Sequence, residues 1–213
     1  MIRLEKRNFK KKILTSIEKL RIKGEKPRVK SISDELELRE EFVRGLLSEL
    51  VSEDLVSSKK GEYSLTNEGR RLIKVGIMGG VFDIIHIGHV KALTEAKESC
   101  DLLVVIVARD ETVLRKKGKK PINGEEKRKF IVESIKPVDV SVLGDLRDFR
   151  KPLNTVSPDL IFLGHDQSLP EEIGTIPSGI QVKRLRVFVK GVSTSNLLNK
   201  LRKNVKHSPK EKL

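Results

Sequence analysis

The sequence predicts an α/β protein in which an open parallel sheet follows a small, mainly helical unit. From residue 74 onward, short apolar runs alternate with helical patterns, the order that parallel α/β sheets require. The run at 102–108 is apolar without interruption, as in strands covered on both faces. Before residue 73 the apolar residues instead recur at helical spacing. We therefore expect two domains, at 1–73 and 74–204, followed by a flexible basic tail at 205–213.

The N-terminal region combines helical patterns with one hairpin. Gly24 and Pro27 are expected to end the first helix, because neither residue continues a helix well. The turn Lys59-Lys60-Gly61 separates two short runs that can pair as strands. The predicted elements are a helix at 8–22, a short helix capped by Ser31 or Ser33 and ending at Leu36, a helix at 39–51, and a hairpin around 55–65. In this order they resemble a winged helix-turn-helix.

The region after residue 73 is expected to hold the parallel sheet and its crossover helices. Apolar runs predict strands, and the alternation near the C-terminus suggests a strand at the sheet edge. The predicted strands are 75–78, 102–108, 138–143, 160–163 and the edge strand 182–188, and the predicted helices are 88–99, 124–136, 146–155 and 194–204.

Composition narrows the function classes without choosing one. The 213 residues carry 44 Lys+Arg against 30 Asp+Glu, a net charge of +14, which favours phosphate, nucleotides or nucleic acid as partners. A single cysteine excludes an intramolecular disulfide framework and a multi-cysteine zinc site. There is no apolar run of about 18 residues and no signal-like apolar segment at the start, so we expect a cytoplasmic protein without a membrane partner.

A strand-to-helix turn carries the chemistry of this sequence. After the strand at 75–78 the chain passes Gly79-Gly80 and enters a helix whose first turn holds His86 and His89. Glycines let the backbone approach a ligand, and a helix N-terminus offers unpaired N–H groups to phosphate. The two histidines are three residues apart and can share one helix face. Two structural histidines at a helix cap are the alternative. Neither the P-loop pattern nor the dinucleotide-binding glycine pattern occurs.

The turn resembles the G-x-F-D-x-x-H-x-G-H signature of the cytidylyltransferase-like nucleotidyltransferases. Three later segments resemble further motifs of that superfamily in the same order. They are the basic segment Arg115–Pro121, which is expected to be a loop and is followed by Glu126-Lys127-Arg128, the segment Gly164-His165-Asp166-Gln167 after a strand, and the segment Gly191–Ser195 before the last helix.

The resemblance implies a Rossmann-like sheet and transfer of a nucleotidyl group from an NTP to a phosphorylated acceptor, with release of pyrophosphate. Mg²⁺ or another divalent cation is implied as the companion of ATP or CTP, and no protein metal site is predicted. Asp83 is further expected to orient a histidine or Lys91, or to help hold the divalent ion. The implied catalytic residues are His86, His89, Lys119 and Arg128, and the implied nucleotide-binding residues are Gly80, Val81, Phe82, Asp83, His86, His89, Asp110, Asp166, Ser193, Thr194 and Ser195.

Further segments resemble the archaeal FAD synthetases, which implies ATP and FMN as substrates. These segments are Val104–Val113, Lys120-Pro121-Ile122, Lys136–Asp139, Leu143-Gly144 and Leu163–Gln167. Two alternatives stay open. One is a cytidylyltransferase acting on glycerol-phosphate or another polyol or sugar phosphate. The other is a DNA-binding regulator whose α/β domain senses a nucleotide or a flavin.

The N-terminal region allows three roles: DNA binding, dimerisation or scaffolding, and ligand-responsive regulation. DNA binding would place the helix at 39–51 in the major groove and Lys59-Lys60 at the tip of the wing. However, that helix opens with Arg39-Glu40-Glu41, and acidic side chains oppose contact with phosphate. We expect a homodimer, with DNA as a possible further partner.

Overall fold

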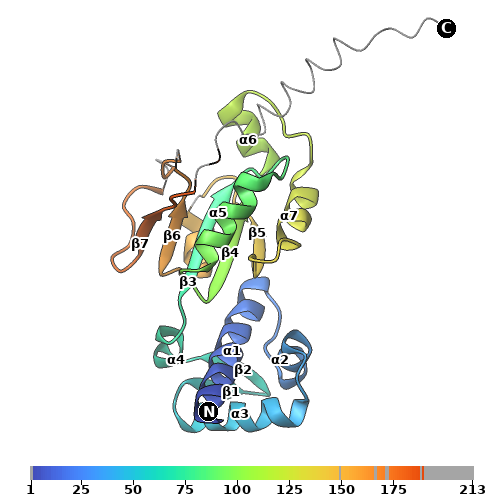
Figure 1. Ribbon diagram of the computed structural model, residues 1–213, viewed down its shortest axis with the longest axis vertical. Coiled ribbons are helices and arrows are strands. Elements are labelled where there is room, and N and C mark those ends of the chain that lie inside the picture. The colour runs from blue at the N-terminus through green and yellow to red at the C-terminus, as the bar shows by residue number, and fades with distance from the viewer. Residues whose placement is uncertain (1, 149, 166, 171–172, 188, 190–213) are drawn as a thin grey trace, which may run out of the picture.

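Two units stack along the long axis of the protein, a mainly helical one at the N-terminus and an α/β one after it (Figure 1). The computed structural model describes residues 2–148, 150–165, 167–170, 173–187 and 189. Within this part of the chain, no helix is both long enough and apolar enough to cross a membrane. The predictions that lie outside it are the helix at 194–204, the tail at 205–213, and the site residues Asp166, Ser193, Thr194 and Ser195.

Three helices build the core of the N-terminal unit: α1 (Ile2–Lys23), α2 (Val29–Leu36) and α3 (Glu40–Ser52). Their apolar faces meet in one cluster that excludes water, and α1 contributes a row of residues at helical spacing. The buried members include Ile13, Leu14, Ile17, Ile32, Val43, Leu46, Leu47 and Leu50. The helices predicted at 8–22 and 39–51 therefore lie where the apolar spacing placed them.

The start of α2 differs from the prediction. Arg28 is the N-cap residue, and Ser31 lies three residues later, inside the helix. The Ser31 hydroxyl accepts a hydrogen bond from the Arg28 backbone N–H at 2.8 Å and donates to the Lys26 carbonyl. Ser31 thus stabilises the helix start from the third helical position, as the second half of a capping box does. Pro27 sets the boundary because a helix rarely continues through the residue that precedes a proline.

A hairpin and a short helix complete the N-terminal unit. Strands β1 (Val56–Lys59) and β2 (Glu62–Leu65) pair antiparallel around Lys60 and Gly61. Both turn residues have positive φ, 52° and 75°, which gives the two-residue turn whose twist suits a hairpin. Helix α4 (Asn67–Arg71) follows directly, and the Thr66 hydroxyl caps it by accepting the Gly69 N–H at 3.1 Å.

The second unit is a five-stranded parallel sheet with the order β5-β4-β3-β6-β7. β3 lies at its centre, and β7 lies at its edge, as predicted, but it ends at Arg184 instead of residue 188 and all of its residues are exposed. The strands are β3 (Val75–Gly80), β4 (Leu102–Val107), β5 (Val140–Leu143), β6 (Leu160–Leu163) and β7 (Gln181–Arg184).

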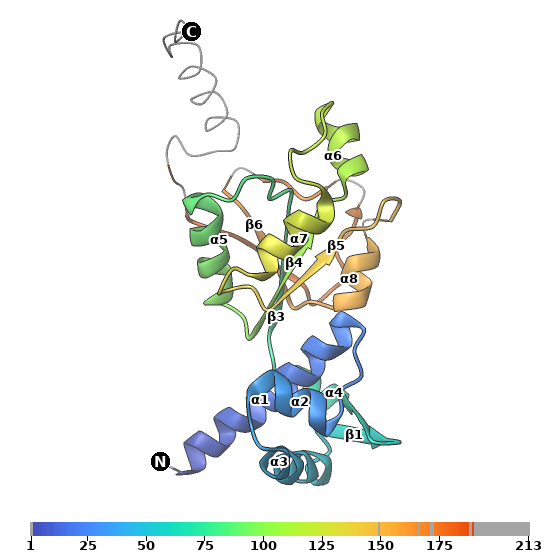
Figure 2. The ribbon, with the colours of Figure 1, turned by 90° about the vertical axis from the view of Figure 1, so that its right-hand side faces the viewer.

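Helices cover both faces of this sheet, so alternate residues of its central strands enter different cores. Ile77 and Val104 pack toward the face that carries α8, whereas Met78 and Val105 pack toward α5 and α7. Figure 2 shows α5 and α8 on opposite sides of the strands. The helices are α5 (Ile87–Lys97), α6 (Asp110–Lys117), α7 (Glu125–Glu133) and α8 (Arg150–Val156).

Helix α6 corrects the prediction of a basic loop from residue 115. Arg115, Lys116 and Lys117 form the last turn of α6, where cations interact favourably with the negative end of the helix dipole. Gly118 then ends the helix with φ 67°, a conformation that glycine adopts without strain. The basic residues after Gly118 lie in the segment that leads to α7.

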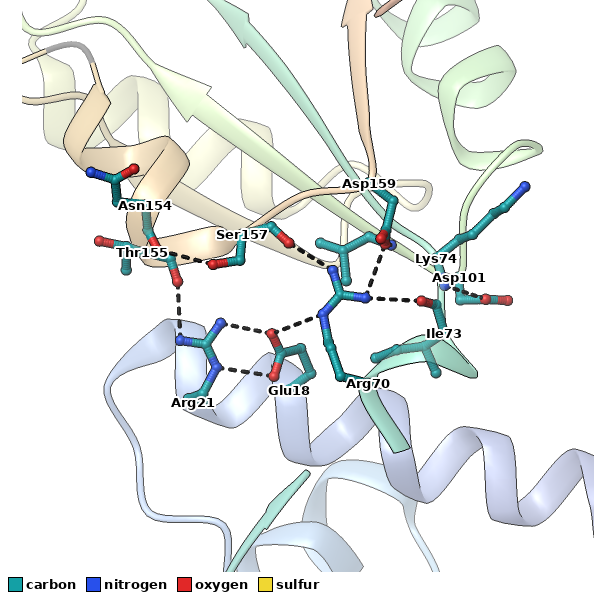
Figure 3. Close-up of polar contacts among 11 residues, drawn as sticks. Glu18, Arg21, Arg70, Ile73, Lys74, Asp101, Asn154, Thr155, Ser157 and Asp159 are labelled. Carbon is teal, nitrogen blue, oxygen red and sulfur yellow. Dashed lines mark hydrogen bonds and ion pairs between the residues drawn. The ribbon is translucent and has the colours of Figure 1, made fainter. Parts of the chain in front are cut away.

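A polar network joins the two units at the amino ends of the strands (Figure 3). Glu18 of α1 is nearly buried, with 4% of its side chain exposed, and Arg21 donates to both of its carboxylate oxygens at 2.9 and 2.7 Å. Arg70 of α4 lies 3.8 Å from the same carboxylate and donates to Asp159 at 2.9 Å. Asp159 in turn accepts the backbone N–H of Val75, the first residue of β3, at 2.7 Å.

The two arginines also bind backbone carbonyls of the α/β unit, in the last turn of α8 and just after it. Arg21 donates to the Thr155 carbonyl at 3.0 Å, and Arg70 donates to the Ser157 carbonyl at 2.7 Å. Two cations therefore face the negative end of the α8 dipole. With two carboxylates and two guanidinium groups the network is electrically balanced, which offsets the cost of burying Glu18.

We predict that Glu18→Ala destabilises the whole chain, because it leaves two guanidinium groups at the junction without their shared carboxylate. The free energy of unfolding should fall by about 2–4 kcal/mol. This is less than for a fully buried ion pair, because Arg21 is half-exposed. Chemical denaturation followed by circular dichroism measures it. Glu40→Ala is the matched control, since the Glu40–Arg44 pair is exposed, and it should cost less than about 1 kcal/mol. Equal losses in the two variants would contradict this prediction.

Candidate active site

The candidate site lies at the carboxyl end of β3, on the opposite edge of the sheet from the N-terminal unit. β3 ends at Gly80, the chain turns through 81–85, and α5 begins at Ile87 with His86 as its N-cap residue. His86 has extended backbone, and its carbonyl accepts the His89 and Val90 N–H groups that open the helix. The turn therefore presents a helix N-terminus at a sheet edge, a place where anions bind in many α/β proteins.

The two predicted histidines lie against each other. The ring centroids of His86 and His89 are 3.8 Å apart and the ring planes are inclined by 21°, so the imidazoles stack. The ring of Phe82 lies 5.3 Å from that of His89 on the inner side. The Nδ1 atoms of both histidines are buried and have no hydrogen-bond partner within the described part of the chain. Unpartnered buried nitrogens next to a helix N-terminus suit an incoming polar ligand.

Burial keeps the imidazole pair neutral. Loss of hydration and, to a smaller extent, the like charge of the neighbouring His86 lower the pKa of His89 to about 4. Loss of hydration also lowers the pKa of His86. At neutral pH each ring is therefore uncharged and offers one N–H donor and one acceptor nitrogen. Binding of a phosphate would favour the protonated form and raise both pKa values.

Two glycines make this arrangement possible. A Cβ atom on Gly88 would lie 3.1 Å from Cε1 and Nδ1 of His86, so the glycine between the histidines leaves room for the first ring. A Cβ atom on Gly80 would lie 2.6 Å from the ring of Phe82, which is buried and has φ 52°. The spacing in the sequence thus reflects close packing in addition to backbone approach to a ligand.

Arg128 is placed differently from the prediction that it approaches the triphosphate. Its side chain is fully buried, and its guanidinium group donates to the Asn123 carbonyl at 2.8 Å and to the Val81 carbonyl. It also donates to the Ala108 carbonyl at 2.7 Å and to the Asp110 carboxylate at 2.6 Å. Arg128 is therefore engaged with the protein itself, and Asp110 is the partner of its charge.

Asp83 likewise binds protein backbone. Its carboxylate accepts the N–H groups of Ile122 and Asn123, each at 2.9 Å, while its carbonyl accepts the side-chain amide of Asn123. This places Asp83 between the histidine loop and the basic segment, instead of on a histidine or Lys91 as predicted. Within the described residues, no group of three or more histidine, cysteine or acidic side chains could hold a metal ion.

Asn123 and Glu125, which no sequence motif indicated, close the loops around Arg128. Glu125 accepts the Asp110 N–H at 2.7 Å and forms an ion pair with Arg109 at 2.9 Å, while Asp110 accepts the Glu125 N–H at 3.3 Å. The helix starts of α6 and α7 therefore cap each other. The acidic residues at the start of the predicted helix 124–136 were the available signal for α7, whereas α6 was not predicted.

A cavity of about 570 Å³ opens beside these helix starts. It has a mixed charge, with cations from the basic segment facing acidic residues of α6 and α7. Lys119, one of the predicted catalytic residues, is exposed in the segment between these helices. The cavity lining includes Arg109, Asp110, Glu111, Lys120, Gly124, Glu126 and Lys127.

The segment Gly164–Gln167 lies at the carboxyl end of β6, the strand next to β3. Gln167 accepts the Gly164 N–H through its side chain at 3.0 Å, and Arg184 donates to the carbonyls of Gly164, His165 and Gln167. Gly164, His165 and Gln167 therefore lie on the same sheet edge as the histidine pair.

We predict that the free energy of unfolding falls as the pH is lowered from about 6.5 to about 4. In this window the unfolded chain binds protons at His89 that the folded chain refuses, because the folded pKa is about 4 and the ordinary value is 6.5. Denaturant titrations at several pH values measure the slope. The control is His89→Asn, which removes the titrating group and should flatten the slope. An unchanged slope in His89→Asn would contradict a neutral, buried His89.

Known proteins resemble both the sequence and the fold. The chain is 51% identical over 100 residues to a protein named FAD synthase from Ferroglobus placidus, a stretch covering 47% of this chain and 64% of that protein. It is 49% identical over 125 residues to a FAD synthase from Aciduliprofundum boonei, covering 57% of this chain and 83% of that protein. The match thus spans less than two thirds of the first relative and most of the second.

A solved structure, titled as the lipopolysaccharide core biosynthesis protein from Thermoplasma volcanium, is 37% identical with a TM-score of 0.51. It matches 55% of this chain and 99% of its own. Residues 77–205 match the cytidylyltransferase-like family, a stretch that begins within β3 and includes the histidine pair. Together with the parallel sheet and the histidine turn, this match shows that the chain belongs to the cytidylyltransferase-like family.

Proposed function

We propose that the chain is an FMN adenylyltransferase that converts ATP and FMN to FAD and pyrophosphate. The observation that carries the proposal is the stacked, neutral histidine pair at the N-terminus of α5, in a chain of which 100 residues are 51% identical to one protein named FAD synthase and 125 residues are 49% identical to another. ATP would enter as its magnesium complex, because the divalent ion screens the triphosphate. Both substrates are abundant in the cytoplasm, where we place the reaction.

In the proposed reaction an oxygen of the FMN phosphate attacks the α-phosphorus of ATP. A new P–O bond forms, and the bond between the α-phosphorus and the leaving pyrophosphate breaks. Negative charge grows on the leaving group and around the α-phosphorus, so the protein contributes by orientation and by donors aimed at that charge. His86 and His89 supply N–H donors, and the N-terminus of α5 adds its partial positive charge.

Most of the remaining predicted residues divide into three groups in this proposal. Lys119 is an exposed cation that can approach the triphosphate, and Gly80 leaves the backbone accessible at the end of β3. Val81, Asp83 and Asp110 instead hold the loops around the histidines in place. Asp166, Ser193, Thr194 and Ser195 keep their proposed role as nucleotide contacts from the resemblance of their motifs.

A nucleotidyltransferase acting on a sugar phosphate is the second candidate. The 37% identity to a protein titled for lipopolysaccharide core biosynthesis supports it, since that match includes nearly the whole of the other chain. The two candidates share the histidine pair and differ in the acceptor.

We propose that residues 1–73 form a winged helix-turn-helix domain joined directly to the transferase domain at 74–204. The three helices and the hairpin support this division. The outer face of α3 carries Glu40 and Glu41, and its Arg44 lies 3.7 Å from Glu40. Such a face would repel DNA phosphates. We therefore propose a scaffold role, or contact between two copies of the chain, instead of DNA binding.

We predict that the purified protein forms FAD and pyrophosphate from ATP, Mg²⁺ and FMN, measured by chromatography of the flavins and a pyrophosphate assay. CTP with glycerol-3-phosphate and ATP with a heptose phosphate are the comparison reactions. Pyrophosphate release only with a sugar phosphate would move the assignment to the second candidate.

We further predict that His89→Ala lowers kcat at least about 10²-fold, the usual cost of removing one donor from a charge-stabilising site. Single-turnover assays with saturating ATP and FMN measure the chemical step. Lys59→Ala, in the hairpin of the N-terminal unit, is the control and should keep the wild-type rate. Full activity in His89→Ala would contradict the role of the histidine pair.

A further inference from the structure

Arg128 is the most completely enclosed charged side chain of the described residues. None of its surface is exposed, although it lies on α7 between exposed neighbours. Burying a guanidinium group is costly unless each donor finds an acceptor and the charge is balanced. Three backbone carbonyls and one carboxylate meet that requirement here. The positions of these acceptors in the chain therefore indicate which segments the buried guanidinium group holds together.

The acceptors come from three separate segments that surround the histidine turn. The Val81 carbonyl belongs to the loop after β3, five residues before His86. Ala108 and Asp110 follow β4, the neighbouring strand of the sheet. The Asn123 carbonyl precedes α7. One planar group thus fixes the relative positions of two loops that leave the same sheet edge and of the segment that connects α6 to α7.

A second tie connects two of these segments independently. Asp83 accepts the N–H groups of Ile122 and Asn123, and Asn123 donates from its side chain to the Asp83 carbonyl. The short loop 81–83 is therefore bound to residues 122–128 at two points. The histidine turn that follows it has little freedom to move away from α7.

We propose that Arg128 is a positioning residue for nucleotidyl transfer: it fixes the loop between β3 and α5, and so the histidine pair, without touching the substrate. This inference rests on the proposed function. Misplacing a catalytic group by about 1 Å can cost about 10²-fold in rate. A loop released from Arg128 would allow the histidines to shift by that amount.

Lysine cannot replace arginine in this role. An ammonium group places its donors at one point, whereas the guanidinium group spreads five N–H donors over a rigid plane. Arg128→Lys keeps the positive charge beside Asp110 but loses contact with some of the three carbonyls. The variant therefore distinguishes the effect of the positive charge on Asp110 from the effect of the hydrogen bonds to the three carbonyls.

The matched control is Arg70→Lys at the other end of β3. Arg70 also donates to two backbone carbonyls and one carboxylate, from Ile73, Ser157 and Asp159, but it lies at the amino edge of the sheet. Both substitutions remove a network of guanidinium contacts, so both should lower the thermal stability. Only the one at the catalytic edge should alter the chemical step.

The experiment measures kcat and KM for ATP and FMN in both variants at a temperature where circular dichroism shows them folded. We expect Arg128→Lys to lower kcat about 10²-fold and to change KM for ATP less than about threefold, because orientation is lost while substrate binding is kept. Arg70→Lys should keep kcat within about threefold. A folded Arg128→Lys with a near wild-type kcat, or equal losses in both variants, would overturn the proposal.

A second readout does not depend on FAD formation. NMR of the histidine Cε1–H signals follows the pKa of His89, which burial holds at about 4. Arg128→Lys should raise this pKa toward 6.5, as the loosened loop hydrates the ring, and Arg70→Lys should leave it unchanged. If the wild type makes no FAD, the proposed function fails, and this titration still decides whether Arg128 positions the histidines. An unchanged His89 pKa in Arg128→Lys would count against it.

Asp110→Asn is the fallback if Arg128→Lys does not fold. The amide keeps an acceptor for Arg128 but removes the balancing charge, so the same changes should appear with a smaller amplitude, about tenfold in kcat. No change in either kcat or the His89 pKa would overturn the proposal.

Discussion

The central strand β3 is held at both ends by a guanidinium group, and the rest of the structure depends on this. At its amino end Arg70 binds the Ile73 carbonyl and also Asp159, the residue that accepts the first N–H of the strand. At its carboxyl end Arg128 binds the Val81 carbonyl. Between these points β3 pairs with β4 on one side and β6 on the other. The strand is thus a fixed axis from the N-terminal unit to the histidine turn.

Buried polar groups near the ends of β3 have two different effects on the free energy of folding. Glu18 and Arg128 are buried charges that are balanced by partners, so they stabilise the arrangement of the chain. The Nδ1 atoms of His86 and His89 are buried without partners in the described residues, which costs stability. That cost is typical of a site that awaits a ligand, because a phosphate can supply the missing interactions. Stability and ligand binding therefore depend on different side chains, although Arg128 and the histidine pair lie at the same end of β3.

The position of the N-terminal unit limits how it could affect catalysis. Its contacts lie at the amino ends of the strands, at residues such as Asp101, Thr155 and Asp159. It cannot cover the histidine pair, which lies at the opposite edge of the sheet (Figure 1). Any influence on the reaction would pass through β3, through the end of α8, or through the end of α7, where Lys23 of α1 lies 3.5 Å from Glu133. This geometry favours a scaffold over a lid.

The sequence by itself determined the order of the elements, the parallel sheet and the histidine pair, because apolar periodicity and the spacing of glycine and histidine are local properties of the chain. It indicated where α5 begins and that β7 lies at an edge. The resemblance of its motifs predicted that Arg128 and Asp83 contact the ligand. In the structure, both side chains form hydrogen bonds with backbone groups. The sequence pattern also missed α6, whose basic last turn looks like a loop. Only the tertiary structure decided these points, since the acceptors of Arg128 come from segments 5 to 47 residues away, and no local pattern encodes such contacts.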